Sequence, residues 1–227
     1  LKERIFEDTS HITSNMRKRG GGIVDIELMD MTHLEPNYYQ LHFTFETCDS
    51  MGANFINSVL EESARILRLF LQAQEHLSIE EREVTIIMAI LSNFTPECLV
   101  RASVSCPVSD LGTFDEGRMS SEEFAEKFTK ALRIAYIDTY RATTHNKGIF
   151  NGIDAVVLAT GNDFRAIEAG GHNYAARTGQ YRSLSFAEVK DGIFHFWLDI
   201  PLAIGTVGGL TTLHHRVRSE ERRVGKE

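Results

Sequence analysis

Residues 39–70 read YQLHFTFETCDSMGANFINSVLEESARILRLF, and this stretch decides the fold. Apolar and polar residues alternate from Tyr39 to Phe45, which predicts a half-buried strand. A short polar turn follows at residues 49–54, and apolar residues then recur at roughly helical spacing as far as Phe70. The local order is therefore strand, tight turn and helix.

Further strands are predicted on both sides of this unit. Residues 23–30 alternate at period two, and the turn at Pro36 joins them to the next strand as a hairpin. Residues 84–91 and 99–106 are apolar runs that indicate two more strands. Together these elements predict a small α+β unit over residues 20–112, with an antiparallel sheet packed on a helix.

The remainder of the chain is rich in helix and glycine. A helix begins after Ser120, whose hydroxyl can cap it, and runs to about Thr139. The small residues of 148–161 and 166–176 indicate helices that pack closely. Residues 194–204 form a final strand or extended segment. The sequence thus predicts a second, helix-rich block.

Composition excludes several classes of protein. The 227 residues carry 24 basic and 32 acidic side chains, a formal net charge of −8, with no basic stripe that would suit nucleic acid. The longest apolar runs fall short of the roughly 20 residues that span a bilayer, so no membrane segment is expected. Three cysteines without metal-ligand spacing predict reduced thiols, no metal site and a cytoplasmic location.

Two glycine-containing loops are candidate phosphate sites. The first precedes a helix, where unsatisfied backbone N–H groups and the helix dipole suit an anion, and the second follows an apolar strand. Their residues are Asp49, Met51, Gly52, Ala53 and Asn54 in the first loop, and Gly205, Thr206, Val207, Gly208 and Gly209 in the second. Neither contains GxGxxG, and taken alone each also fits a plain cap or turn.

A polar segment at residues 141–152 concentrates cationic and amide side chains between glycines. Asp163 follows Lys147 after sixteen positions, in a run of small residues. A buried Lys147–Asp163 pair would keep the ammonium charged, and it could then stabilise an alkoxide formed when hydride reaches a carbonyl. An ordinary surface ion pair is the alternative, and spacing alone does not decide between the two.

Three blocks in order resemble the signatures of 3-hydroxy-3-methylglutaryl-coenzyme A (HMG-CoA) reductases. They read DSMGAN at residues 49–54, HNKGIFNG running on into ATGND at residues 145–163, and IGTVGG at residues 204–209. The second block is similar to the bacterial-type, class II enzymes. The resemblance covers about residues 20–213.

This resemblance implies roles for individual residues. Lys147 would be the catalytic cation, and Asp163 its hydrogen-bonded carboxylate. Arg141 would bind the free carboxylate of the substrate, and Asn151 would support Lys147. The two glycine loops would hold NADPH or NADH, with the choice between them undetermined, and a coenzyme A thioester would be the substrate.

The resemblance also implies a fold and an assembly. The expected class is α+β, with a small ferredoxin-like nucleotide-binding domain inserted in a larger helix-rich substrate-binding domain. Residues 1–19 would end a truncated part of the large domain, 20–112 would be the small domain and 113–213 part of the large one. Residues 214–227 are interpreted as a non-native-looking tail, with a disordered basic tail as the alternative. A homodimer or dimer-based oligomer is expected.

Two motifs of the resembled family are absent from this sequence. The family uses a glutamate in an N-terminal motif and a histidine on a C-terminal flap. Because both proton-handling motifs are lacking, the chain as given is expected to be inactive or nearly so. A non-catalytic module that binds a nucleotide or acyl-coenzyme A is therefore the alternative function.

Overall fold

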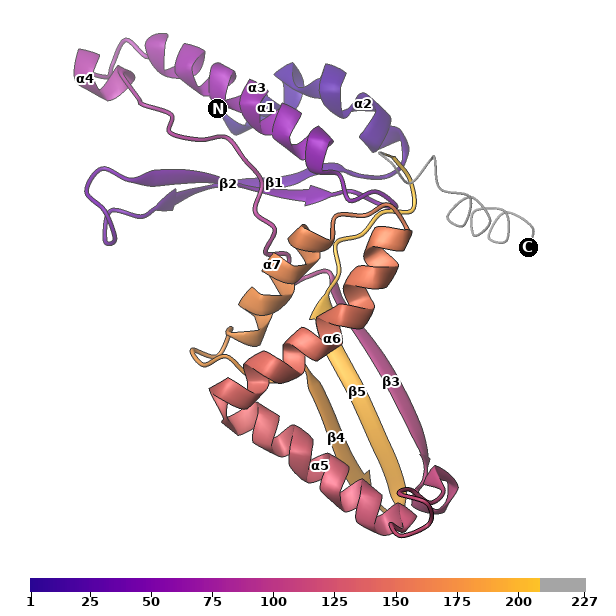
Figure 1. Ribbon diagram of the computed structural model, residues 1–227. Helices are drawn as coiled ribbons and strands as arrows, with labels where there is room; N and C mark the ends of the chain where they lie inside the picture. The colour runs from indigo at the N-terminus through magenta and orange to yellow at the C-terminus, as the bar shows by residue number, and fades with distance from the viewer. Residues whose placement is uncertain (209–227) are drawn as a thin grey trace. The chain divides into compact units, whose positions relative to one another are not determined.

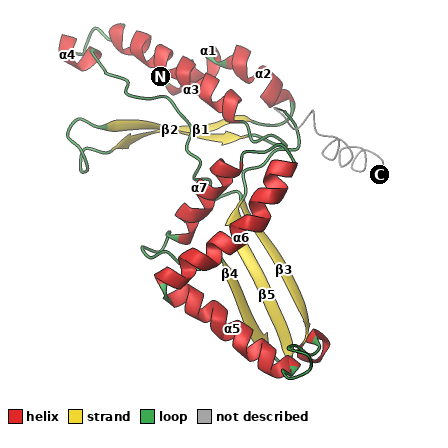
Figure 2. Ribbon diagram, viewed as in Figure 1, coloured by secondary structure: helices red, strands yellow, loops and turns green. Residues whose placement is uncertain are grey.

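A computed structural model describes residues 1–208, and these residues form two compact units (Figures 1 and 2). The first unit is Leu1–Ser92 together with the segment that begins at Gly205, and the second includes Asn93–Ile204. Gly209 and the predicted tail at residues 214–227 lie outside the described residues. The mixed helix-and-sheet class expected from the sequence is confirmed.

Unit 1 is a hairpin covered by helices. Its elements are α1 (Lys2–Asp8), α2 (Ser10–Lys18), β1 (Gly22–Asp30), β2 (Tyr39–Glu46), α3 (Ala53–Gln72) and α4 (Ile79–Arg82). Strands β1 and β2 pair antiparallel, as predicted, with a register shift between Ile23 and Asp25. Buried Ile5, Ile26 and Ile66 join α1, β1 and α3 in one apolar cluster. Burial of this face holds the long α3 on the hairpin.

Unit 2 is a three-stranded antiparallel sheet with helices packed on it. Its elements are β3 (Leu99–Pro107), the short 3-10 helix η1 (Val108–Leu111), α5 (Ser121–Ile137), α6 (Thr139–Ala159), α7 (Phe164–Ala175), β4 (Ser185–Lys190) and β5 (Ile193–Pro201). The strand order is β3-β5-β4. Helix α5 lies lengthwise along the sheet (Figure 1), and the ring of its Phe128 packs edge-on against Phe194 and Phe196 of β5. The predicted cap is present, because the Ser120 hydroxyl accepts a hydrogen bond from the Glu123 N–H.

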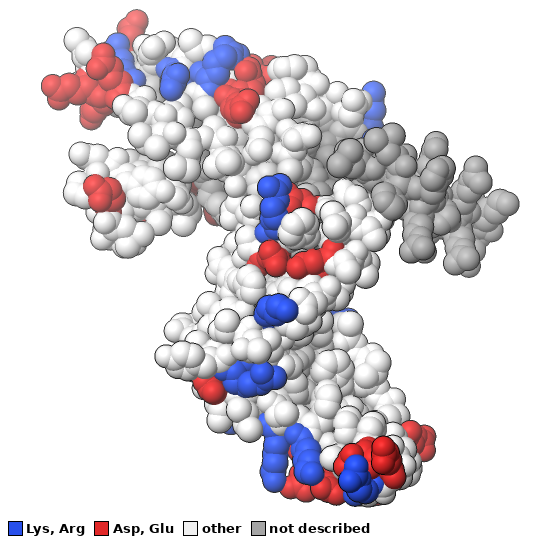
Figure 3. Space-filling view, in the orientation of Figure 1, with Lys and Arg blue, Asp and Glu red and all other residues white. Residues whose placement is uncertain are grey.

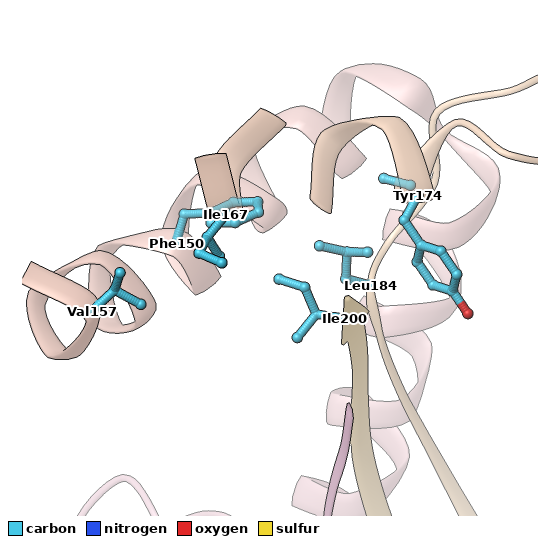
Figure 4. Packing of buried hydrophobic residues seen from close by; sticks show 7 residues of the cluster. Phe150, Val157, Ile167, Tyr174, Leu184 and Ile200 are labelled. Carbon is cyan, nitrogen blue, oxygen red and sulfur yellow. The ribbon is translucent and has the colours of Figure 1, made fainter. Parts of the chain in front are cut away.

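The main core of unit 2 lies where α6 and α7 meet the sheet (Figure 4). Its buried members come from four separate segments, so the core forms only when those segments are brought together. They are Phe150, Val157, Ile167, Tyr174, Ala175, Leu184 and Ile200. Gly171 permits this close packing, since a Cβ atom there would lie 2.6 Å from the Phe150 ring.

Two strand predictions differ from the structure. Residues 84–91 were predicted to be a strand, and this prediction is wrong, because they have no regular secondary structure and expose Ile87 and Met88. Strand β3 does form where expected, but it pairs with β5 of unit 2 instead of joining the hairpin. A strand needs a hydrogen-bonded partner, which its own sequence does not specify. The units accordingly divide at Ser92, whereas the sequence placed the boundary at residue 112. Residues 1–19, which were assigned to the large domain, lie in unit 1 instead, because buried Ile5 packs on Ile26 and Ile66.

Charges of both signs are interspersed on the face of the molecule drawn in Figure 3. Large areas of that face are neither basic nor acidic. No helix among residues 1–208 is long and apolar enough to cross a membrane. Within the same residues, no group of three or more His, Cys, Asp or Glu side chains is arranged to hold a metal ion.

Candidate functional site

The first glycine loop leads from β2 into α3. Gly52 is the residue that caps the N-terminus of α3, with a left-handed backbone (φ 80°), and no side chain caps the helix. A Cβ atom at Gly52 would lie 2.5 Å from Cγ2 of Thr47, so a larger residue would be strained and would also clash. The turn therefore does cap the helix, as its plain interpretation predicted, but through the backbone of Gly52 and without a side-chain hydrogen bond. Backbone groups, which suit an anion, define the start of the helix instead.

The second glycine loop packs directly on the first, within unit 1. The N–H groups of Thr206 and Val207 both donate to the carbonyl oxygen of Asp49, at 2.8 and 3.2 Å. Gly205 is buried, and a Cβ atom there would lie only 2.6 Å from the backbone nitrogen of Met51. Two loops that are far apart in the sequence are thus joined to each other by backbone hydrogen bonds. The sequence proposed both loops as cofactor-binding, and the structure brings their described parts together.

Three predicted site residues are exposed on α6: the catalytic Lys147 and the substrate-binding Arg141 and Asn151. Lys147 and Asn151 are separated by four residues, so they share one face of the helix. Arg141 is also exposed, but six residues rotate it by about 120° from Lys147 at 3.6 residues per turn. The helix therefore places Lys147 and Asn151 on the same side, while Arg141 faces a different side of α6.

Asp163 is not paired with Lys147 in this structure. Its carboxylate caps α7 by accepting from the Arg165 N–H, and it forms an ion pair with the Arg165 guanidinium at 3.2 Å. The hydrogen bond from Arg165 is the largest cause that lowers the pKa of Asp163. Lys147 is about 18 Å from the end of α6 at a rise of about 1.5 Å per residue, and Asp163 follows that end. Among residues 1–208, no ion pair joins the two.

A pair of carboxyl groups between α6 and α7 was missed by the sequence reasoning. Asp154 and Glu168 interact, and Oδ1 of Asp154 is buried without a hydrogen-bond partner. Burial raises the pKa of Asp154, the charge of Glu168 and a hydrogen bond with it raise that pKa further, and His172 opposes the shift. The available signal was spacing, because Asp154 is two helical turns from Lys147 and Glu168 is one turn from His172.

This carboxyl pair makes a testable contribution to stability. Because the pKa of Asp154 is higher in the folded chain than in the unfolded one, folding favours its protonated form. The stabilisation is complete below the unfolded pKa, about 3.9 for an aspartate, and is lost as pH rises through the folded pKa. When it is measured by urea denaturation across this pH range, the free energy of unfolding should depend less on pH for Asp154→Asn than for the unaltered chain.

The matched control for that measurement is Asp191→Asn, in the exposed turn between β4 and β5. Its substitution removes one carboxylate of the same unit without touching the α6–α7 contact. An equal change in pH dependence for the two variants would contradict a special role for Asp154.

A family model described as hydroxymethylglutaryl-coenzyme A reductase matches residues 1–221. The chain is 34% identical over 214 residues to the 3-hydroxy-3-methylglutaryl-coenzyme A reductase of Archaeoglobus fulgidus. It is 33% identical over the same length to a probable reductase of that name from Borreliella burgdorferi. Each alignment covers 94% of this chain but only 44% and 46% of the relatives, so the chain spans less than half of their length.

Solved structures of the same kind of protein also match. The chain aligns over its whole length with 3-hydroxy-3-methylglutaryl-coenzyme A reductase from Streptococcus pneumoniae, with TM-score 0.80, 35% identity and 51% of that chain covered. A second structure from that organism, described as a class II reductase bound to NADPH in open conformations, aligns with TM-score 0.79, 34% identity and 58% coverage. The family match covers most of the chain, and the identities exceed 30%. The chain therefore belongs to the hydroxymethylglutaryl-coenzyme A reductase family.

Proposed function

We propose that this chain is the part of an HMG-CoA reductase that carries the cofactor loops and the catalytic lysine. The reaction is the reduction of HMG-CoA to mevalonate and coenzyme A with two molecules of NADPH or NADH. The observation that carries the proposal is the joining of the two glycine loops by the hydrogen bonds to Asp49, in a family whose S. pneumoniae member is described with NADPH bound. The chain covers about half of the length of these relatives.

The loops fit a dinucleotide by their backbone geometry. A Cβ atom at Gly52 or Gly205 would clash with Thr47 or with the backbone of Met51, so both glycines are needed for the loops to take this conformation. The start of α3, without a side-chain cap, presents N–H groups that suit a phosphate. When bound, the cofactor supplies hydride. The loop residues would bind and orient it. Unit 1, which contains both loops, then takes the place of residues 20–112 as the proposed nucleotide-binding domain.

On α6 the proposed roles are those that the family resemblance implies. The Lys147 ammonium would stabilise negative charge on the substrate oxygen, and Asn151 on the same face would support it. Arg141 would bind the free carboxylate of the substrate through its planar guanidinium. For Asp163 to act on Lys147, it would have to exchange its contact with Arg165, whose ion pair is partly exposed. Exchange of this ion pair alone would not join the two residues, because Lys147 lies about 18 Å along α6 from the end that Asp163 follows.

A homodimer is part of the proposal. Apolar side chains are exposed where α5 ends and α6 begins, with Ile134, Ile137 and Tyr140 at 49, 52 and 90% exposure. An apolar surface of this kind suits contact with another protein chain. A cytoplasmic location is proposed as well, and it is supported by the free thiols of Cys48, Cys98 and Cys106.

The proposed function can be tested on this chain joined to the flanking segments of the S. pneumoniae relative. We expect the joined polypeptide to oxidise NADPH or NADH only when HMG-CoA is present, and to release mevalonate. The chain by itself should bind the cofactor but show little or no turnover. Cofactor binding by the joined polypeptide without any mevalonate would favour the non-catalytic binding module instead.

A further inference from the structure

The two residues that precede Lys147 are held inside unit 2. Asn146 is fully buried in the middle of α6, at 0% exposure, between the buried side chains of Ala142 and Phe150 on the same face. A buried amide is unfavourable unless its polar atoms are hydrogen-bonded. Because Asn146 lies in an apolar stripe, both polar atoms of its amide need hydrogen-bond partners inside the protein.

Both ends of the Asn146 amide bind backbone groups of the segment between α7 and β4. Its Nδ2 donates to the carbonyl oxygen of Arg182 at 2.9 Å, and its Oδ1 accepts from the N–H of Leu184 at 3.1 Å. A carbonyl can only accept and an N–H can only donate, so these contacts admit one orientation of the amide. The Asn146 amide thus bonds two backbone groups that are two residues apart, Arg182 and Leu184, at the same time.

His145 adds a contact to the same segment. Its Nε2 lies 2.7 Å from the Oγ of buried Ser185, the first residue of β4. Burial lowers the pKa of His145, and the positive charge of Arg141 lowers it further, which favours the neutral ring. Two consecutive residues of α6 are therefore bonded to residues 182, 184 and 185.

These bonds fix the rotation of α6 about its own axis. The apolar side chains of the same face, such as Phe150 and Val157, orient that face toward the core, whereas the hydrogen bonds are directional and tie α6 to particular backbone atoms. On its other side, Cβ atoms placed at Gly148 or Gly152 would meet nothing within 4 Å, so packing there imposes no orientation. With Asn146 pointing inward, the next residue is rotated by about 100° and faces outward. That residue is Lys147.

We propose that Asn146 is a positioning residue, which sets the direction of the Lys147 ammonium by bonding α6 to the segment before β4. The inference rests on the proposed function, in which that ammonium acts on the substrate oxygen. In the sequence His145-Asn146-Lys147, the first two residues would then position the third. Asn146 acts through Lys147 and does not touch the substrate.

Kinetics of the joined polypeptide test this assignment. Asn146→Ala should lower kcat about 10- to 100-fold, which is the size of effect expected from misplacing a reacting group by about 1 Å. The KM for NADPH should stay unchanged, because the cofactor loops belong to unit 1. The matched control is Val157→Ala, which also truncates a buried side chain of α6 but lies ten residues from Lys147. It should keep kcat within about twofold once the melting temperature has been taken into account.

A double-mutant comparison separates positioning from general damage. If Asn146 acts through Lys147, then adding Asn146→Ala to Lys147→Ala should lower kcat no further. Additive losses in the double variant would overturn the inference. Retention of turnover by Lys147→Ala alone would instead contradict the proposed function, so the two failures are distinguishable.

Asn146→Asp supplies a second variant if the alanine protein does not fold. An ionised carboxylate cannot donate to the Arg182 carbonyl, whereas a protonated one can donate there and still accept from Leu184. The kcat of Asn146→Asp relative to the unaltered protein should therefore rise as pH falls. A ratio that stays constant with pH, or a kcat equal to that of the unaltered protein throughout, would overturn the assignment.

Discussion

Lys147→Ala should abolish nearly all turnover of the joined polypeptide while leaving cofactor binding intact. The ammonium is the group proposed to stabilise the negative oxygen that forms on the substrate. Removal of one such group lowers kcat on the order of 10²- to 10³-fold. Lys147 is exposed on α6 and is not part of the core, so the melting temperature should change little. Steady-state kinetics with a parallel NADPH titration measure both quantities.

Lys190→Ala is the matched control, because it removes an exposed lysine of the same unit at the end of β4. Its kcat should equal that of the unaltered protein. Lys147→Arg should remain impaired, since a planar guanidinium is not interchangeable with a compact ammonium. Normal turnover in Lys147→Ala would remove the central residue of the proposed mechanism.

Gly205→Ala should separate the two cofactor loops and weaken nucleotide binding by about 10- to 30-fold. The added Cβ would lie 2.6 Å from the backbone nitrogen of Met51 and 3.1 Å from the backbone of Ser50, so one loop must move. The movement would break the two bonds to the Asp49 carbonyl, each contributing about 1 kcal/mol. Isothermal titration calorimetry with NADPH and with NADH on the chain itself gives the affinity.

A glycine that faces open space is the control for this change. In Gly152→Ala the new Cβ atom meets nothing within 4 Å, and alanine favours a helix interior over glycine by about 1 kcal/mol. This variant should melt at an equal or higher temperature and bind the cofactor normally. Unchanged affinity in Gly205→Ala would show that the contact between the loops is not needed for binding.

Local elements of the fold could be predicted because their causes are local. The alternation of residues 39–45 and the polar turn at 49–54 each involve neighbours in sequence, and β2 and α3 form there. The cap at Ser120 could be predicted for the same reason, because its hydroxyl bonds a backbone N–H only three residues away. Residues 84–91 have the composition of a strand, yet they stay irregular, and β3 pairs with β5. The choice of a strand's partner depends on residues far along the chain.

The candidate site divides in the same way. The sequence by itself determined which residue types are present, among them Lys147, Asn151 and the two glycine loops, and their order carried the family resemblance. Only the tertiary structure showed that Asp49 binds the second loop, that Asp163 is paired with Arg165, and that Asn146 is buried and donates to the Arg182 carbonyl. Chemical type is a property of one residue, whereas burial and partnership arise when distant segments pack together.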